Sequence, residues 1–253
     1  MMVPSRLVGG QSNNAKHRMN KNCKTALWPC AMLSVSLLVS AQAAIVFSDD
    51  FDNPNGTLLN GKAPDVGDAV WSVTAGAATL DVNAGTLDTS GGGRAAFGAF
   101  ASALGSGEKL TLTYTTVDPA GTFMGGTGYS GVSLFTGASE DFFTGERYNV
   151  GEWGVQGVAA GGQFTSGDST VATTATFTYI YDTGEWSFVT SAGVDMSGTG
   201  TVGKAINRLR IANGNGADIA LDGLSVDISA IPEPSSSVML GLCGIGLVLK
   251  RRR

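Results

Sequence analysis

The protein has 253 residues, of which 43% are hydrophobic and 15% are charged, and its formal net charge is −5. The charged fraction lies below the roughly 25% that is usual for soluble domains, and this average conceals two ends that differ from the middle. The ends hold every cysteine (Cys23, Cys30 and Cys243) and the single histidine, His17. The middle of the chain therefore cannot use Ser-His-Asp or Cys-His catalysis, or a His/Cys zinc site.

Residues 1–43 have the three parts of a secretory signal peptide, preceded by a short extension. A basic stretch begins at Met19, residues 26–39 are apolar or small without a charge, and a small-x-small pattern ends at Ala43. This pattern predicts cleavage by signal peptidase between Ala43 and Ala44, with Met19 as the true start. An uncleaved anchor is the alternative, but fourteen residues fall short of the roughly 20 that span a bilayer.

Residues 44–230 form the expected mature body, and this body is acidic. It has seven Lys and Arg residues against twenty Asp and Glu residues, a formal net charge of −13. Such a surface repels nucleic acid, so no nucleic-acid partner is expected. Disulfides cannot stabilise a body without cysteine, so its stability must come from its core, and from a metal ion if one binds.

Short alternating runs bounded by Gly, Asn, Asp and Ser indicate strands and turns along this body. The expected strands cover, in chain order, residues 45–47, 70–73, 110–117, 129–135, 176–181, 186–190, 208–212 and 218–228. Residues 182–185 make a hairpin loop, and Gly223 is expected to break the last strand. Many short strands joined by Gly-rich turns predict an all-β fold, an antiparallel β-sandwich.

The order of these features resembles a known domain family. An opening at residues 47–52, middle features at 129–135, 142–143 and 150–155, and an end at 219–226 are similar to concanavalin A-like or LamG-like jelly-roll domains. Such domains occur in bacterial surface proteins. The resemblance implies that the first and last strands pair side by side.

The chain ends in residues 231–253, which combine three features. The motif Pro232, Glu233 and Pro234 is followed by the apolar run 238–249, and four basic residues close the chain. A run this short makes a marginal membrane helix, and its basic end should stay in the cytoplasm. The mature body would then lie outside the membrane.

This tripartite end resembles the PEP-CTERM sorting signal. The resemblance implies an exosortase-type membrane enzyme that recognises the tail and processes the protein near the motif. It also implies a Gram-negative bacterium that makes extracellular polysaccharide. We expect an exported protein of the cell surface or extracellular matrix, held transiently at the inner membrane by its C-terminal helix.

Glycoside hydrolysis needs two placed carboxylates, and the sequence offers no clear pair. Laminarinase-type jelly rolls carry Glu-x-Asp-x-Glu on one strand, and this triplet is missing. Glu140 and Asp141 are adjacent and would point to opposite faces, while Glu146 and Glu152 are six residues apart. Enzymatic activity is therefore not expected.

Calcium is the more plausible ligand, because it accepts oxygen ligands in flexible geometry. Asp50 and Asp52 alternate near the first strand and Asp222 lies in the last, so pairing of those strands could bring them together. We expect any such calcium to be structural. The alternative is that these are solvated charges that protect a sheet edge.

Carbohydrate binding would use exposed aromatic faces with polar neighbours. Tyr148 and Trp153 lie in an expected loop region, and Tyr181 with Trp186 flanks the hairpin loop. The alternative for the hairpin pair is a core position. The leading hypothesis is a non-enzymatic adhesive or structural surface protein that contributes to extracellular polysaccharide or biofilm. A carbohydrate-binding module is the alternative, and a glycoside hydrolase is third.

Overall fold

The computed structural model describes residues 43–75, 81–83, 85–89, 94–117, 128–146, 151–169, 171–214, 217 and 219–232. The predicted signal peptide up to residue 42 and the predicted C-terminal helix lie outside these residues. None of the residues within these ranges belongs to a helix with the length and apolarity needed to cross a membrane.

The regular structure of the described residues is all strand. The strands are β1 (Ala44–Asp49), β2 (Thr57–Leu58), β3 (Ser72–Ala75), β4 (Asp81–Asn83), β5 (Thr86–Thr89), β6 (Arg94–Ala99), β7 (Glu108–Thr116), β8 (Tyr129–Thr136), β9 (Ser139–Glu146), β10 (Glu152–Gln156), β11 (Phe164–Asp168), β12 (Thr174–Ile180), β13 (Glu185–Thr190), β14 (Asp195–Thr199), β15 (Arg208–Gly214) and β16 (Ile219–Ala230).

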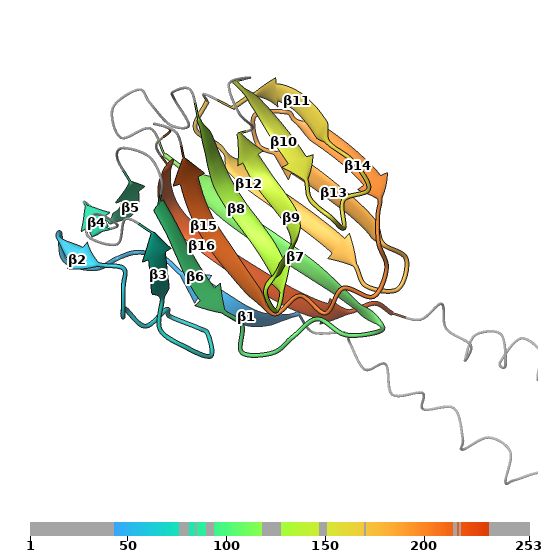
Figure 1. Ribbon diagram of the computed structural model, residues 1–253, viewed down its shortest axis with the longest axis horizontal. Coiled ribbons are helices and arrows are strands. Elements are labelled where there is room, and N and C mark those ends of the chain that lie inside the picture. Colours follow the sequence, from blue (N-terminus) through green and yellow to red (C-terminus); the bar gives the residue numbers. More distant parts are fainter. Residues whose placement is uncertain are drawn as a thin grey trace, which may run out of the picture. The chain divides into compact units, whose positions relative to one another are not determined.

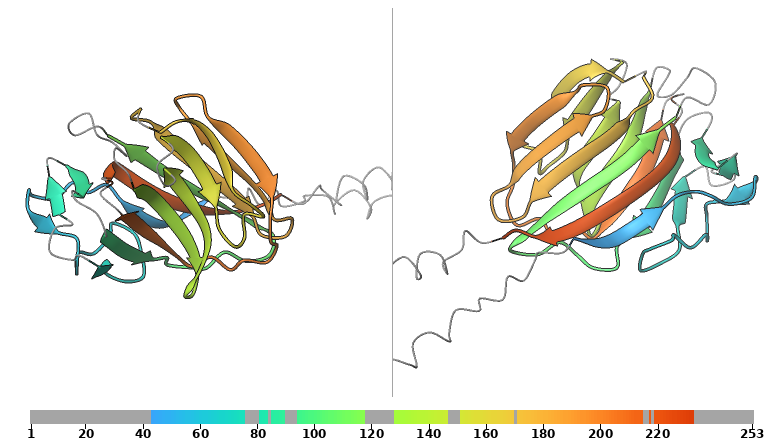
Figure 2. Two further views of the ribbon diagram at one scale, coloured as in Figure 1. Left: turned by 45° about the horizontal axis from the view of Figure 1, so that its top comes forward. Right: turned by 180° about the vertical axis from the view of Figure 1, so that it is seen from behind.

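These strands form two antiparallel sheets packed face to face. One is a nine-stranded sheet in the order β14-β13-β12-β7-β16-β5-β4-β2, with β1 paired to β16 outside this path. The other is a seven-stranded sheet in the order β11-β10-β9-β8-β15-β6-β3. The seven-stranded sheet faces the viewer in Figure 1, and the nine-stranded sheet comes to the front when the molecule is seen from behind in Figure 2. The predicted antiparallel β-sandwich is confirmed.

The first and last strands of the sandwich lie side by side, as the resemblance implied. Ala44 pairs with Ile228 and Asp49 pairs with Leu224, and the rear view in Figure 2 shows the blue first strand along the red last one. The expected break at Gly223 is wrong, because β16 continues through it. The register of β16 on β7 shifts between Leu221 and Gly223, so the glycine belongs to a bulge that bends the strand without ending it.

The core lies between the sheets and is rich in aromatic rings. On β7 every second residue is buried, which places Leu110, Leu112 and Tyr114 inside. Rings from the two sheets meet across the core, with the centroids of Phe142 and Phe177 5.0 Å apart. Burial of each such side chain stabilises the fold by about 1.5–3 kcal/mol. The same alternation turns the remaining residues of each strand outward, and this fixes the composition of the outer faces.

Candidate functional site

Two arginines and two phenylalanines gather on the outward face of the seven-stranded sheet. Arg208 and Arg210 alternate on β15 with the buried Leu209, so both arginines point away from the core. Arg208 stands opposite Phe135 on β8, and Arg210 stands opposite Phe97 on β6. Phe97, Phe135, Arg208 and Arg210 are called the Arg–Phe cluster below.

The rings of this cluster hold the guanidinium groups. The Cζ atom of Arg208 lies 4.8 Å from the ring centroid of Phe97 and 5.3 Å from that of Phe135. The Cζ atom of Arg210 lies 5.1 Å from the same Phe135 centroid. The two rings meet edge to face, with centroids 5.5 Å apart. Cation–π contacts therefore fix two positive charges over one aromatic pair.

The two arginines differ in their polar partners. Nη2 of Arg210 donates to Oε1 of Glu140 at 3.0 Å and to Oγ of Ser133 at 3.2 Å. Arg208 has no ion pair with any residue that the structure describes, while the buried Nε atoms of both arginines have no hydrogen-bond partner there. The outward face thus carries one guanidinium that forms an ion pair with none of the described carboxylates.

A groove of about 560 Å³ lies beside this cluster, with Glu140 at its border. Its lining is Glu140, Phe143, Gln156, Gly157, Val158, Gly162 and Gln163. Phe143 is buried and adds only apolar lining, the two glutamines contribute amide groups, and Val158 is 72% exposed. A mixture of apolar surface and a few polar groups is typical of small-molecule sites of this size.

Gly157 gives the groove its shape. Its φ is 132°, in a region that L-residues with a side chain rarely adopt, and a Cβ there would lie only 2.3 Å from the carbonyl oxygen of Asp141. The residue allows the loop after β10 to fold down onto β9, where the NH of Ala159 also donates to the Asp141 carbonyl at 2.9 Å. Only glycine fits this close approach.

The three acidic residues of β9 take different directions. Glu140 points outward to Arg210, while Asp141 is buried opposite a register shift and pairs with Nζ of Lys204 at 2.8 Å. Glu146 is 3% exposed and stands opposite Ser130, which is also buried. Burial, more than the hydrogen bond from the backbone NH of Gly151, controls Glu146 and raises its pKa to about 7.

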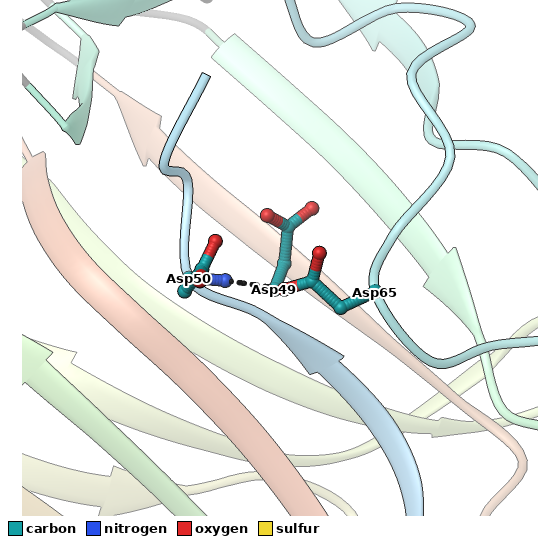
Figure 3. A group of neighbouring side chains, drawn as sticks. All are labelled: Asp49, Asp50 and Asp65. Atoms are coloured by element: carbon teal, nitrogen blue, oxygen red, sulfur yellow. Dashed lines mark hydrogen bonds between the residues drawn. The ribbon is translucent and has the colours of Figure 1, made fainter.

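A second group of carboxylates lies where β1 leaves its sheet. Figure 3 shows Asp49 and Asp50 at the end of this strand and Asp65 on a neighbouring loop, and oxygen atoms of all three lie within 4.8 Å of one another. Nζ of Lys62 contacts both oxygens of Asp49, at 2.7 and 2.8 Å, and Nε1 of Trp71 donates to Oδ2 at 2.6 Å. An ammonium group therefore already balances the one buried member of this group.

The predicted calcium set of Asp50, Asp52 and Asp222 is not the set that the fold assembles. Of the three, only Asp50 belongs to the group of carboxylates found in the described ranges. Asp222 is exposed at the bulge of β16, beyond the residues that pair with β1, and Asp52 is exposed after β1 has ended. The spacing therefore selected two carboxylates that lie outside this group.

The expected aromatic platform is wrong for Trp153. Trp153 lies on strand β10 and not in a loop. The Trp153 side chain faces inward and is 0% exposed, and its ring centroid lies 5.4 Å from that of Phe188. A buried indole cannot stack on a sugar. Tyr148 lies outside the described residues. Trp186 of the hairpin is 2% exposed, so it takes the core position that was the alternative, while Tyr181 is half-buried.

The residues that line the outward face were not predicted from the sequence. Alternation over residues 208–212 predicted a strand, and its polar positions are both arginine. That repeated arginine was the signal for the cluster. Phe143 and Glu140 had no such signal, because the register shift on β9 breaks the alternation of that strand.

Comparison with known proteins identifies the tail and the fold. Residues 230–253 match the PEP-CTERM protein-sorting motif, which implies export, sorting to the cell surface and processing by an exosortase. No curated protein sequence matches the chain significantly.

The body matches solved structures of the concanavalin A-like type. An endo-1,3-beta-glucanase from Streptomyces sioyaensis superposes with a TM-score of 0.52 at 11% identity, covering 75% of this chain and 97% of that one. Beta-agarase A from Zobellia galactanivorans gives 0.49 at 9% identity, covering 75% and 94%. The body therefore has the fold of a concanavalin A-like jelly-roll sandwich. At such identities the likeness defines the fold, and function has to be argued from the residues.

Proposed function

We propose that this exported protein is a non-catalytic adhesive domain that binds extracellular polysaccharide along the outward face of its seven-stranded sheet. The observation that carries the proposal is the position of the groove directly beside the Arg–Phe cluster, joined to it through the contact of Glu140 with Arg210. Amide, carboxylate and guanidinium groups beside apolar surface are the chemistry that hydrogen-bonds and packs against sugars. The sorting motif would deliver such a domain to a surface where polysaccharide is present.

The carboxylates favour binding over hydrolysis. Glycosidases need two carboxyl groups about 5–9.5 Å apart on either side of the scissile bond. Glu140 is the one carboxylate among the described residues that line the groove, and Arg210 already engages it. Asp141 and Glu146 of the same strand are buried and point elsewhere.

A blocking substitution tests the site. Gly162 has no positive φ, and a Cβ at this position would meet only the Phe164 ring, at 3.4 Å. Gly162→Trp should therefore fill the groove without opening the core. Gly105→Trp is the matched control, since Gly105 also lacks a positive φ and its Cβ would meet only the Glu108 side chain, at 3.3 Å.

The exported protein with its tail, kept in mild detergent, is tested on a panel of soluble polysaccharides by affinity electrophoresis. We expect retardation by at least one polysaccharide, abolished in Gly162→Trp and retained in Gly105→Trp. Retardation that survives Gly162→Trp would place binding elsewhere. Release of reducing sugar from any member of the panel would replace the proposal with the hydrolase alternative.

A further inference from the structure

The Arg–Phe cluster is an exception in the charge pattern of the body. Residues 44–230 have a formal net charge of −13, and five of their seven basic side chains are described. Lys62 and Lys204 are each bound to a buried aspartate. Lys109 stands on the opposite sheet, outward of β7. The two remaining cations, Arg208 and Arg210, are adjacent on one face and share one aromatic ring.

Glu140 balances only one of these two charges. It contacts Arg210 at 3.0 Å, and no described carboxylate contacts Arg208. Two guanidinium groups held over Phe135 repel each other, so an anion placed between them would be bound by both. Arginine binds carboxylates through two parallel N–H groups, and such charge-assisted bonds are about twice as strong as neutral ones. Because the cation–π contacts already order the side chains, little conformational entropy is lost on binding.

A neutral sugar would leave this positive charge unused. We infer that the polysaccharide bound on this face is acidic, and that Arg208, together with Arg210, binds the carboxylate of a uronic acid residue in it. This inference rests on the proposed function, since it concerns the same face. The groove would take the neighbouring sugars, and the cluster would select the charged one.

Two oligosaccharides that differ only in charge test this inference on the unaltered protein. The probes are tetragalacturonate and the same oligomer with its carboxyl groups reduced to alcohols. Short oligomers limit the long-range repulsion between an acidic domain and a polyanion, as does a measurement near 0.15 M salt, where the Debye length is about 8 Å. Titration calorimetry on the exported protein should give binding of tetragalacturonate about tenfold or more tighter than of the reduced oligomer.

Variants then locate the effect. Arg208→Gln should weaken tetragalacturonate binding by about tenfold and leave binding of the reduced oligomer unchanged. Lys109→Gln removes the same charge from the opposite sheet and should change neither. A thermal melt of each variant shows whether it is folded, and the comparison of the two oligomers stands without any variant.

The possible results distinguish acidic specificity from polysaccharide binding as such. Equal affinity for both oligomers, with binding that Gly162→Trp abolishes, would overturn the acidic specificity and leave the polysaccharide site intact. Tighter binding of tetragalacturonate that Arg208→Gln does not weaken would remove the role of the cluster. Absence of binding to either oligomer and to the whole polysaccharide panel would overturn both proposals.

Discussion

Replacing Glu146 with glutamine should make the protein more stable at neutral and alkaline pH. Glu146 is buried in the sandwich, and burial raises the pKa of its carboxyl from 4.5 to about 7. The folded state therefore keeps a proton that the unfolded chain releases between these two values. This contribution is fully present below pH 4.5 and is lost as the pH rises through 7.

The size of the effect follows from those two values. Each pH unit between them is worth about 1.4 kcal/mol, so ionisation of Glu146 costs the fold at most about 3 kcal/mol. Glutamine has nearly the same shape, has no charge, and its Oε1 can still accept the hydrogen bond that the NH of Gly151 donates at 3.2 Å. Glu146→Gln should differ from the wild type by less than about 1 kcal/mol at pH 5 and exceed its free energy of unfolding by up to about 3 kcal/mol at pH 8.

Urea denaturation followed by tryptophan fluorescence, at several values between pH 5 and 8, measures this difference. Glu152→Gln is the control, because it removes a carboxylate from an exposed position on the adjacent strand. Its pH profile should follow that of the wild type. Parallel profiles for Glu146→Gln and the wild type would show that the buried carboxyl of Glu146 contributes nothing to the pH dependence between pH 5 and 8.

Three further perturbations test the packing and the carboxylate group. Asp49→Asn should lower the free energy of unfolding by about 3–5 kcal/mol in urea titrations, because it leaves the ammonium of Lys62, whose side chain is 7% exposed, without a counter-charge. Adding Lys62→Met should recover part of that loss. No recovery would contradict an ion-pair effect. Trp153→Ala should cost about 3–5 kcal/mol by opening a cavity against Phe188, and a loss below 1 kcal/mol would mean that the indole is not packed as described. The midpoint of thermal unfolding should be the same in calcium as in a chelator, because Lys62 already balances the charge of Asp49. If calcium instead raises the midpoint and Asp222→Asn removes that rise, the calcium ligands predicted from the sequence are correct.

The sandwich could be predicted because its information is local. The strict alternation of residues 110–117 and the hairpin at 182–185 each depend on neighbours in the chain, and β7, β12 and β13 follow them closely. The pairing of the first and last strands came from the resemblance to a domain family. The alternation alone does not define which strands are neighbours.

The face of the sheet could not be predicted where the register shifts. On β9 the extra residue Asp141 breaks the alternation, so nothing in the sequence says that Glu140 and Phe143 share the outward face. The prediction for Trp153 was wrong for a related reason. The glycine-rich sequence around it is typical of a loop, but Trp153 faces inward on β10.

Contacts between residues far apart in the sequence could not be predicted either. Asp49 meets Lys62 and Trp71, which lie 13 and 22 residues away, and only the folded chain brings them together. The carboxylates were therefore grouped by proximity in the sequence, and this grouping selected Asp52 and Asp222. The Arg–Phe cluster likewise combines residues of β6, β8 and β15, which become neighbours only through the order of the sheet.

Hydrogen exchange of the exported protein, with and without a polysaccharide that retards it in electrophoresis, shows directly whether the groove binds polysaccharide. The segment 157–163 lies outside the strands and borders the groove, so its amides can report an occupant. Bound polysaccharide should slow exchange in this segment and leave the outward positions of β7 and β16 unchanged. Slower exchange confined to the nine-stranded sheet would contradict binding in the groove.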